Sequence, residues 1–135
     1  MSQPKTPPPS VLLIMWGAFL VSHGLFLFVG EFIRPPAAEH PESAEMMAMV
    51  LTGVGLMTAL GSALAVPLIA PKANYFTAMI LRFAIAESVS IYGLVLATLG
   101  APKMWCYLLA ALGVLAHVVA YPSERERQRF ERDQD

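Results

Sequence analysis

A carboxylic acid, Glu87, lies near the middle of an apolar stretch that is long enough to cross a bilayer, residues 76–99. An ionisable side chain at the centre of a membrane helix costs about 2.5–3.5 kcal/mol, so it marks a candidate functional site. Glu87 is eleven residues from Phe76, about 16 Å along a helix and close to the bilayer midplane. Desolvation at that depth favours the neutral carboxyl. A group that is neutral toward lipid and ionised toward water can carry a proton.

Hydroxyl groups near Glu87 are candidate partners for its carboxyl. Ser88 and Tyr92 follow it at i+1 and i+5, and because they are themselves four residues apart they share a helix face. On the preceding apolar segment, Thr58 and Ser62 are the polar residues nearest the same depth.

The text Leu-Arg-Phe-Ala-Ile-Ala-Glu-Ser-Val-Ser-Ile-Tyr-Gly-Leu-Val-Leu-Ala, residues 81–97, resembles the carboxylate-bearing outer helix of the rotary ATPase c subunit, or proteolipid. The resemblance covers this helix and the loop before it. It implies that Glu87 takes a proton from one half-channel and releases it to another, with Ser88, Tyr92 and the Ile85 carbonyl as partners. The proton-binding set that the resemblance implies is Glu87, Ser88, Tyr92 and Thr58, where Thr58 stands in for the family's inner-helix ligand and Ser62 is a further polar partner. Sodium-binding members add a Gln or a second acid on the inner helix, and because this chain has neither there, the resemblance implies a proton.

Two further ionisable side chains lie within apolar segments. His23 is twelve residues into the first segment, about 18 Å deep, so it is either a neutral histidine hydrogen-bonded within the bundle or a partner of Glu87. Arg82 departs from the c-subunit pattern, where this position is small or apolar, and we expect it to reach lipid headgroups or another helix. His117 is about one turn from the end of the last segment, where it can snorkel, and no role is predicted for it.

The elements that must position these residues are transmembrane helices. Of 135 residues, 56% are hydrophobic and 14% charged, which is too apolar for a soluble domain of this size. Four segments approach the ~20 residues that a spanning helix needs, and their bounds are 11–33, 45–70, 76–99 and 104–121. The expected fold is an all-α, polytopic membrane protein, a four-transmembrane-helix bundle made of two hairpins.

Lysines and arginines in the loops and tails predict the orientation. With both termini inside, the cytoplasmic side holds Lys5, Lys72 and the four arginines that follow Pro122, against Arg34 and Lys103 outside. The positive-inside rule therefore predicts an N-in/C-in protein, with a bacterial inner membrane as the expected location.

Two polar flanks border the transmembrane domain, 11–121. Residues 1–10 are Pro-rich and are expected to form a disordered lead-in. The charged tail, 122–135, begins with a Ser123/Glu126 capping box, which predicts a helix. Three pairs in it have helical spacing, Glu124/Arg127, Glu126/Arg129 and Arg127/Glu131. With four arginines and five acids the tail is nearly neutral, so it is expected to be a solvated face or a docking site for a partner subunit rather than a patch for anionic lipid or nucleic acid.

Three functions remain open from the sequence. The first is a c-subunit-like protein in which Glu87 translocates protons, and the second is a structural or accessory subunit in which Glu87 pairs internally with His23. A small transporter is the third, although four unbroken helices leave little room for alternating access. No catalytic set, metal cluster, phosphate loop or cofactor site is predicted, and Cys106 alone forms no internal disulfide. The expected partners are the lipid bilayer and other subunits, identical or not, and no nucleic acid.

Overall fold

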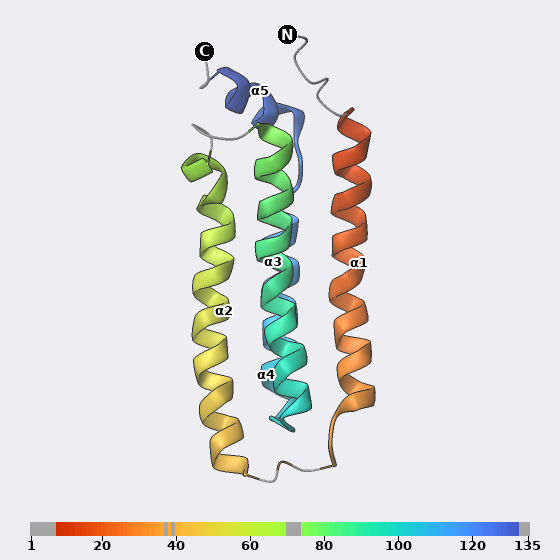
Figure 1. Ribbon diagram of the computed structural model, residues 1–135, viewed down its shortest axis with the longest axis vertical. Coiled ribbons are helices and arrows are strands. Elements are labelled where there is room, and N and C mark those ends of the chain that lie inside the picture. The colour runs from red at the N-terminus through yellow and green to blue at the C-terminus, as the bar shows by residue number, and fades with distance from the viewer. Residues whose placement is uncertain (1–7, 37, 39, 70–73, 133–135) are drawn as a thin grey trace.

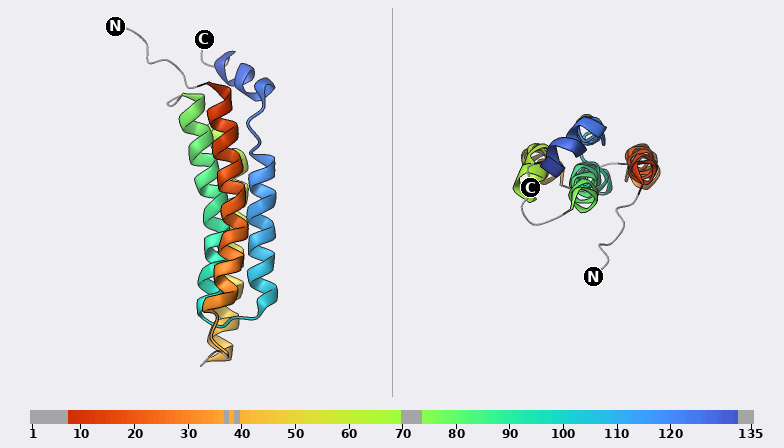
Figure 2. Two further views of the ribbon diagram at one scale, coloured as in Figure 1. Left: turned by 90° about the vertical axis from the view of Figure 1, so that its right-hand side faces the viewer. Right: turned by 90° about the horizontal axis from the view of Figure 1, so that it is seen from above.

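The computed structural model describes residues 8–36, 38, 40–69 and 74–132, and within these residues the chain is entirely helical. Its five helices are α1 (Pro9–Ile33), α2 (Pro41–Ile69), α3 (Tyr75–Thr98), α4 (Lys103–Val119) and α5 (Glu124–Arg132). The first four run side by side along one axis, and the short α5 lies across the end of the bundle where α1 begins (Figures 1 and 2). The all-α prediction is therefore confirmed for the described residues.

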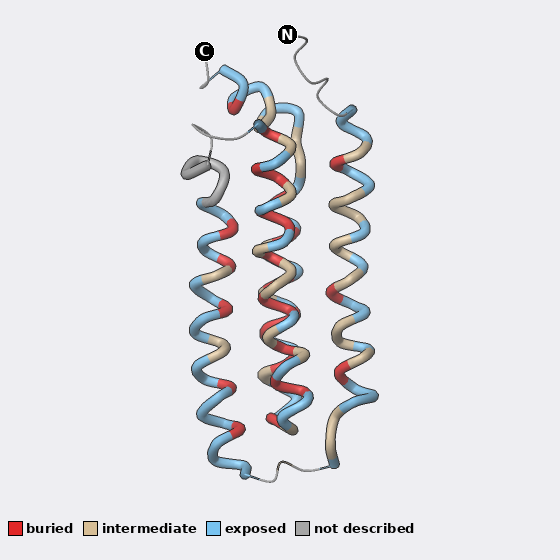
Figure 3. The backbone as a smooth tube through the Cα atoms, viewed as in Figure 1, coloured by how far each residue is buried: buried red, intermediate tan, exposed pale blue. Residues whose placement is uncertain are grey.

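Helix α3 is the centre of the bundle. It contacts each of the other helices, and within the described residues α1 and α2 do not contact one another. The burial pattern agrees, because α3 is buried on several sides whereas the described side chains of α1 and α2 are buried along the face toward α3 and α4 (Figure 3). Side chains on α3 consequently meet partners from three directions.

Three helices, α1, α2 and α3, are long and apolar enough to cross a membrane. Helix α4 has 17 residues and becomes a fourth candidate when it is taken together with α5, from which it is bent by 65°. Large apolar side chains cover the outer faces; Phe32, Met57 and Met104 are examples that are more than two-thirds exposed. An apolar surface of this extent suits lipid rather than water.

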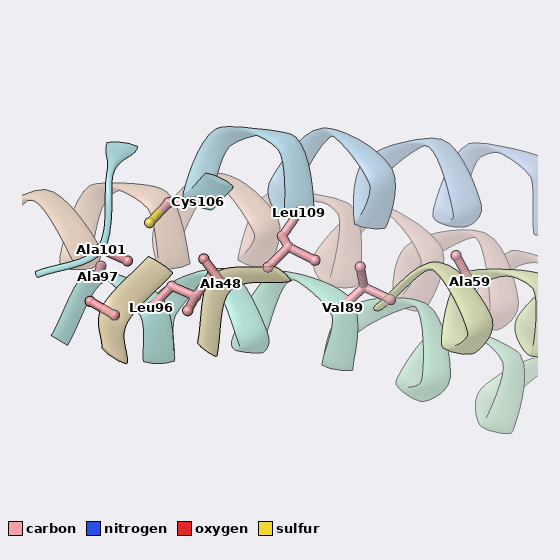
Figure 4. Packing of buried hydrophobic residues seen from close by; sticks show 9 residues of the cluster. Ala48, Ala59, Val89, Leu96, Ala97, Ala101, Cys106 and Leu109 are labelled. Carbon is pink, nitrogen blue, oxygen red and sulfur yellow. The ribbon is translucent and has the colours of Figure 1, made fainter. Parts of the chain in front are cut away.

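Two apolar clusters hold the bundle together. One joins α2, α3 and α4, where small residues such as Ala48 and Ala59 let α2 approach Val89 and Leu96 of α3 (Figure 4). The other lies at the opposite end and contains Leu12 of α1, Phe83 of α3 and Phe130 of α5. Between the two clusters the contact of α1 with α3 and α4 is polar.

The predicted boundaries shift by a few residues. Helix α2 begins at Pro41 rather than 45, because proline is well suited to the first helical position, where its missing N–H costs nothing. Helix α1 begins at Pro9, inside the predicted lead-in, for the same reason. The rest of that lead-in, residues 1–7, and the predicted end of the second span at 70 lie outside the described residues.

The capping prediction for the tail is confirmed in part. The Glu126 backbone N–H donates to Ser123 Oγ over 3.2 Å, and α5 follows. Arg127 bonds Glu131 at 2.9 Å, as the spacing predicted. The side chain of Glu126 does not complete the box or pair with Arg129; it turns into the bundle, where it meets Arg82 of α3 at 2.7 Å. A buried guanidinium needs a carboxylate more than an exposed helix end does.

Candidate functional site

Polar side chains gather in the interior where α1, α3 and α4 meet. His23 on α1, Ser90 on α3 and His117 on α4 are all buried, and Ser22 and Glu87 are half-buried beside them. We call these five residues the polar core. Buried polar groups in an apolar interior need hydrogen-bond partners, so their contacts define what the site can do.

The closest partner of Glu87 comes from α1. Ser22 Oγ lies 2.5 Å from Glu87 Oε1, within hydrogen-bond distance and at the short end of the range for two oxygens. The same Ser22 oxygen lies 2.6 Å from the carbonyl oxygen of Phe19, one helical turn earlier. Glu87 is therefore tied to the backbone of α1 through one hydroxyl.

His23 bonds to α3 one turn further along. Its Nδ1 lies 2.5 Å from Ser90 Oγ, and its Nε2 makes no hydrogen bond with any described residue. Gly113 of α4 makes room for this pair: a Cβ added there would collide with the Ser90 hydroxyl and lie 3.2 Å from two atoms of the His23 ring. The absence of a side chain at Gly113 thus allows an imidazole to lie between three helices.

His117 joins α4 to α1 through two reciprocal bonds. Its Nε2 donates to the Trp16 carbonyl over 2.9 Å, and Trp16 Nε1 donates to the His117 carbonyl over 3.0 Å. Since a carbonyl only accepts, Nε2 carries the proton, and in the neutral ring Nδ1 is an acceptor. This Nδ1 has no hydrogen-bond partner among the described residues. Phe19 and Phe83 pack against the ring.

The two imidazoles and the carboxyl lie near one another. The rings of His23 and His117 meet edge to face with centroids 5.2 Å apart, and Glu87 bonds Ser22, the residue next to His23 on α1. No three His, Cys, Asp or Glu side chains in the described ranges are placed to hold a metal ion. The arrangement is suited to binding and passing a proton, since every member is a weak acid, a weak base or a hydroxyl.

The hydroxyls of two other predicted site residues bond the backbone of their own helices. Ser88 Oγ donates to the Ile85 carbonyl within α3, at 2.7 Å, and Thr58 Oγ1 donates to the Val54 carbonyl within α2, at 2.8 Å. Tyr92 packs on the apolar cluster of α2, α3 and α4. No hydrogen bond joins Glu87 to any of these three side chains, or to His23, in the part of the chain that the structure describes.

Ser62 and Arg82 form a second polar site nearer the α5 end. Ser62 is buried and donates to the Arg82 carbonyl over 3.0 Å, which links α2 to α3. The Arg82 guanidinium bonds Glu126 of α5 and lies 3.4 Å from the Val119 carbonyl. This agrees with one of the two expectations for Arg82, that it reaches another helix. These contacts anchor the tail helix and do not reach Glu87.

Sequence reasoning missed Ser22, Ser90, His117 and Gly113. The expectation that His117 snorkels is wrong, because its ring is fully buried between α1 and α3. Two signals pointed to the serines: Ser22 precedes His23 directly, and Ser90 lies three residues after Glu87 and so on the same face of α3.

Comparison with protein-family models, with curated proteins and with solved structures finds no match to this chain. The likeness of residues 81–97 to rotary ATPase c subunits therefore stays a hypothesis from the sequence. What the protein does has to be argued from the chemistry of the polar core.

Proposed function

We propose that this chain is an integral membrane protein that binds and releases a proton at Glu87, with His23 and His117 as neighbouring proton acceptors. The topology we propose with it has four spans, α1 to α4, and both termini in the cytoplasm. The apolar outer faces of α1 and α2 support the membrane location. The start of α1 and the arginine-rich α5 lie at one end of the bundle, which supports a common, cytoplasmic side for them (Figure 1).

The contacts of one hydroxyl carry the proposal. Ser22 Oγ lies within hydrogen-bond distance of two oxygens, the Phe19 carbonyl and Glu87 Oε1. A hydroxyl has one proton, and the carbonyl has none to give. Ser22 makes two full hydrogen bonds when it donates to Phe19 and accepts from a protonated Glu87, which supports a protonated carboxyl; with an ionised carboxyl it has one proton to share between two acceptors. Loss of that proton leaves two acceptors competing for one donor, so the carboxyl is coupled to the local structure of α1.

The histidines provide the route for the proton. His23 Nε2 and His117 Nδ1 are buried and make no hydrogen bond with the described residues, an arrangement that costs about 1–3 kcal/mol for each group. A buried polar group that keeps such an energetic cost calls for an explanation. An imidazole is a weak base, and beside a carboxylic acid it can accept a proton. The proposed transfer runs between Glu87 and the two imidazoles inside the bundle.

This geometry favours exchange within one bundle over exchange at the rim of a rotating ring. In the c-subunit hypothesis the carboxyl meets an external half-channel. Here α1 contacts the Glu87 face of α3 through Ser22, so α1 would have to move to admit a stator subunit. We propose a self-contained proton site in a homo-oligomer or in a subunit of a larger complex.

A specific observation supports a second candidate, a structural or accessory subunit. The reciprocal Trp16 and His117 bonds and the His23–Ser90 bond fasten α1 to α3 and α4, which is what a purely architectural polar core would do. In that function Glu87 keeps one protonation state and only holds α1 in place.

Modification by dicyclohexylcarbodiimide, which reacts with protonated carboxyls in apolar surroundings, separates the two. The purified protein in detergent is treated across pH 5–9, and the modified peptide is identified by mass spectrometry. Proton binding predicts labelling of Glu87 that falls as pH rises, is absent in Glu87→Gln, and persists in Glu31→Gln, whose carboxylate is exposed and paired with Lys103 at the other end.

Two results would overturn the proton proposal in favour of the accessory one. The first is labelling of Glu87 that stays constant across the whole pH range. The second combines two observations. Glu87 is not labelled at any pH, either in wild type or in Ser22→Ala, which lacks the hydroxyl beside the carboxyl, and Glu87→Gln lowers the stability of the bundle.

A further inference from the structure

Helix α5 carries a second candidate site, which the nearly neutral charge of the tail conceals. Four arginines and five acids follow Pro122. Those among the described residues, up to Arg132, lie on different faces of α5. Glu126 is turned inward onto Arg82, and Glu124 and Glu131 lie with Arg127 on another face. The remaining arginines share one face of α5, because they are spaced at i, i+4 and i+7; they are Arg125, Arg129 and Arg132. Among the described residues of α5, the only carboxylate near this face is that of Glu126, which is already bonded to Arg82.

A groove runs along this arginine face. It has a volume of about 690 Å³, and its opposite wall is formed by Val119 at the end of α4 and by Tyr121 just after it, both about half exposed. Phe130 holds α5 in place from the other side by packing edge to face on Tyr75 of α3, at 5.5 Å between ring centroids. The 65° bend between α4 and α5 places α5 across the end of the bundle (Figure 2).

The two walls of the groove differ in chemistry. One presents guanidinium groups, which bind phosphate oxygens through paired N–H donors. The other continues the apolar outer face of α4, and its tyrosine is a residue that favours the level of lipid headgroups. A ligand that fits both walls has an anionic phosphate next to an acyl chain. This matches a lipid of the surrounding bilayer, whereas free phosphate would use the cationic wall alone.

We propose that the groove between α5 and the end of α4 binds the headgroup of an anionic phospholipid, with Arg125 and Arg129 as the phosphate-binding residues. The inference rests on the membrane location proposed above, but not on proton binding. It reverses the expectation that the tail has no patch for anionic lipid, because that expectation rested on the summed charge and the structure separates the charges in space.

Native mass spectrometry of the full chain in detergent tests the site, with phosphatidylglycerol and phosphatidylcholine titrated separately. Wild type should retain phosphatidylglycerol at concentrations at which phosphatidylcholine is lost. Arg125→Gln and Arg129→Gln should each weaken retention about fivefold, since an arginine near the surface contributes that much to binding of anionic lipid. Both side chains are exposed, so neither change should disturb the fold.

Arg127→Gln is the matched control, because it removes the same charge from the same helix on a face outside the groove. It should change retention by less than about twofold. If Arg127→Gln and Arg129→Gln lost phosphatidylglycerol retention equally, the effect would come from the overall charge of the protein, and the proposal would be overturned. Equal retention of the two lipids by wild type would overturn it as well.

Inorganic phosphate distinguishes a lipid from a free anion. At millimolar concentration it should leave bound phosphatidylglycerol in place, since it cannot use the apolar wall. Displacement at that concentration would show a site for a free anion instead and would also overturn the proposal. Glu87→Gln alters proton binding and leaves this groove untouched, so the lipid and proton proposals can fail separately.

Discussion

Arg82 of α3 and Glu126 of α5 form an ion pair of 2.7 Å that ties the tail helix to the centre of the bundle. The arginine side chain is only 6% exposed and the glutamate 30%. A buried guanidinium without its carboxylate would keep its desolvation cost and lose its compensation. The pair explains how a cation is tolerated in an otherwise apolar helix.

Removal of this carboxylate should destabilise the protein. Glu126→Gln leaves Arg82 buried without a charged partner, and we expect the free energy of unfolding to fall by about 2 kcal/mol. Unfolding by SDS titration, followed by circular dichroism, measures the change. Glu124→Gln is the control, because Glu124 is 60% exposed and its contact with Arg127 is 4.0 Å long, so the loss should be within about 0.5 kcal/mol. Equal losses in both variants would contradict the assigned role.

The His23–Ser90 pair occupies the space left by the missing side chain at Gly113. Gly113→Ala places a methyl group against the Ser90 hydroxyl and the His23 ring, and overpacking of this kind should cost about 1–3 kcal/mol. Gly24→Ala is the control on the neighbouring helix, where nothing lies within 4 Å of an added Cβ. Because alanine favours a helix, Gly24→Ala should be neutral or stabilising by up to about 1 kcal/mol. The same SDS titration separates the two, and a neutral Gly113→Ala would argue against this packing.

The stability contribution and the carbodiimide labelling of the Glu87 carboxyl should depend on Ser22 rather than on Ser88. Ser22→Ala removes the hydroxyl that lies 2.5 Å from the carboxyl and should lower the free energy of unfolding by about 1 kcal/mol. It should also change the pH at which carbodiimide labelling of Glu87 is half complete. Ser88→Ala removes only a bond to the Ile85 carbonyl inside α3 and should change neither quantity measurably. The reverse result, an effect of Ser88→Ala alone, would favour the c-subunit arrangement of the site.

His23 and Ser90 should be energetically coupled. In a double-mutant cycle of His23→Phe and Ser90→Ala, unfolding free energies should give a coupling of about 1 kcal/mol, since each single change strands the other buried group. A second cycle pairs His23→Phe with Thr58→Ala, whose hydroxyl bonds its own helix on α2. That coupling should be zero within about 0.5 kcal/mol. Zero coupling in the first cycle as well would contradict the assigned hydrogen bond between His23 and Ser90.

Local properties of the chain predicted the helices and several of the polar residues. The four apolar segments recur as α1 to α4 with shifts of a few residues, because helix formation and termination depend on composition and on neighbours within one turn. The Ser123 cap and the Arg127–Glu131 pair were predictable for the same reason. Glu87 stood out because a single carboxyl within an apolar stretch is visible without any knowledge of packing.

The partners of those residues were decided by the tertiary structure. Ser22 rather than Ser88 meets Glu87, and Glu126 rather than a headgroup meets Arg82, because the rotation of each helix about its axis determines which faces touch. That rotation depends on contacts between residues far apart in the chain, such as the fit of His23 into the space at Gly113. Composition and depth therefore determined which ionisable groups enter the apolar region. Only the packing of α1, α3 and α4 decided which of them lie within reach of one another, since that depends on steric fit between helices.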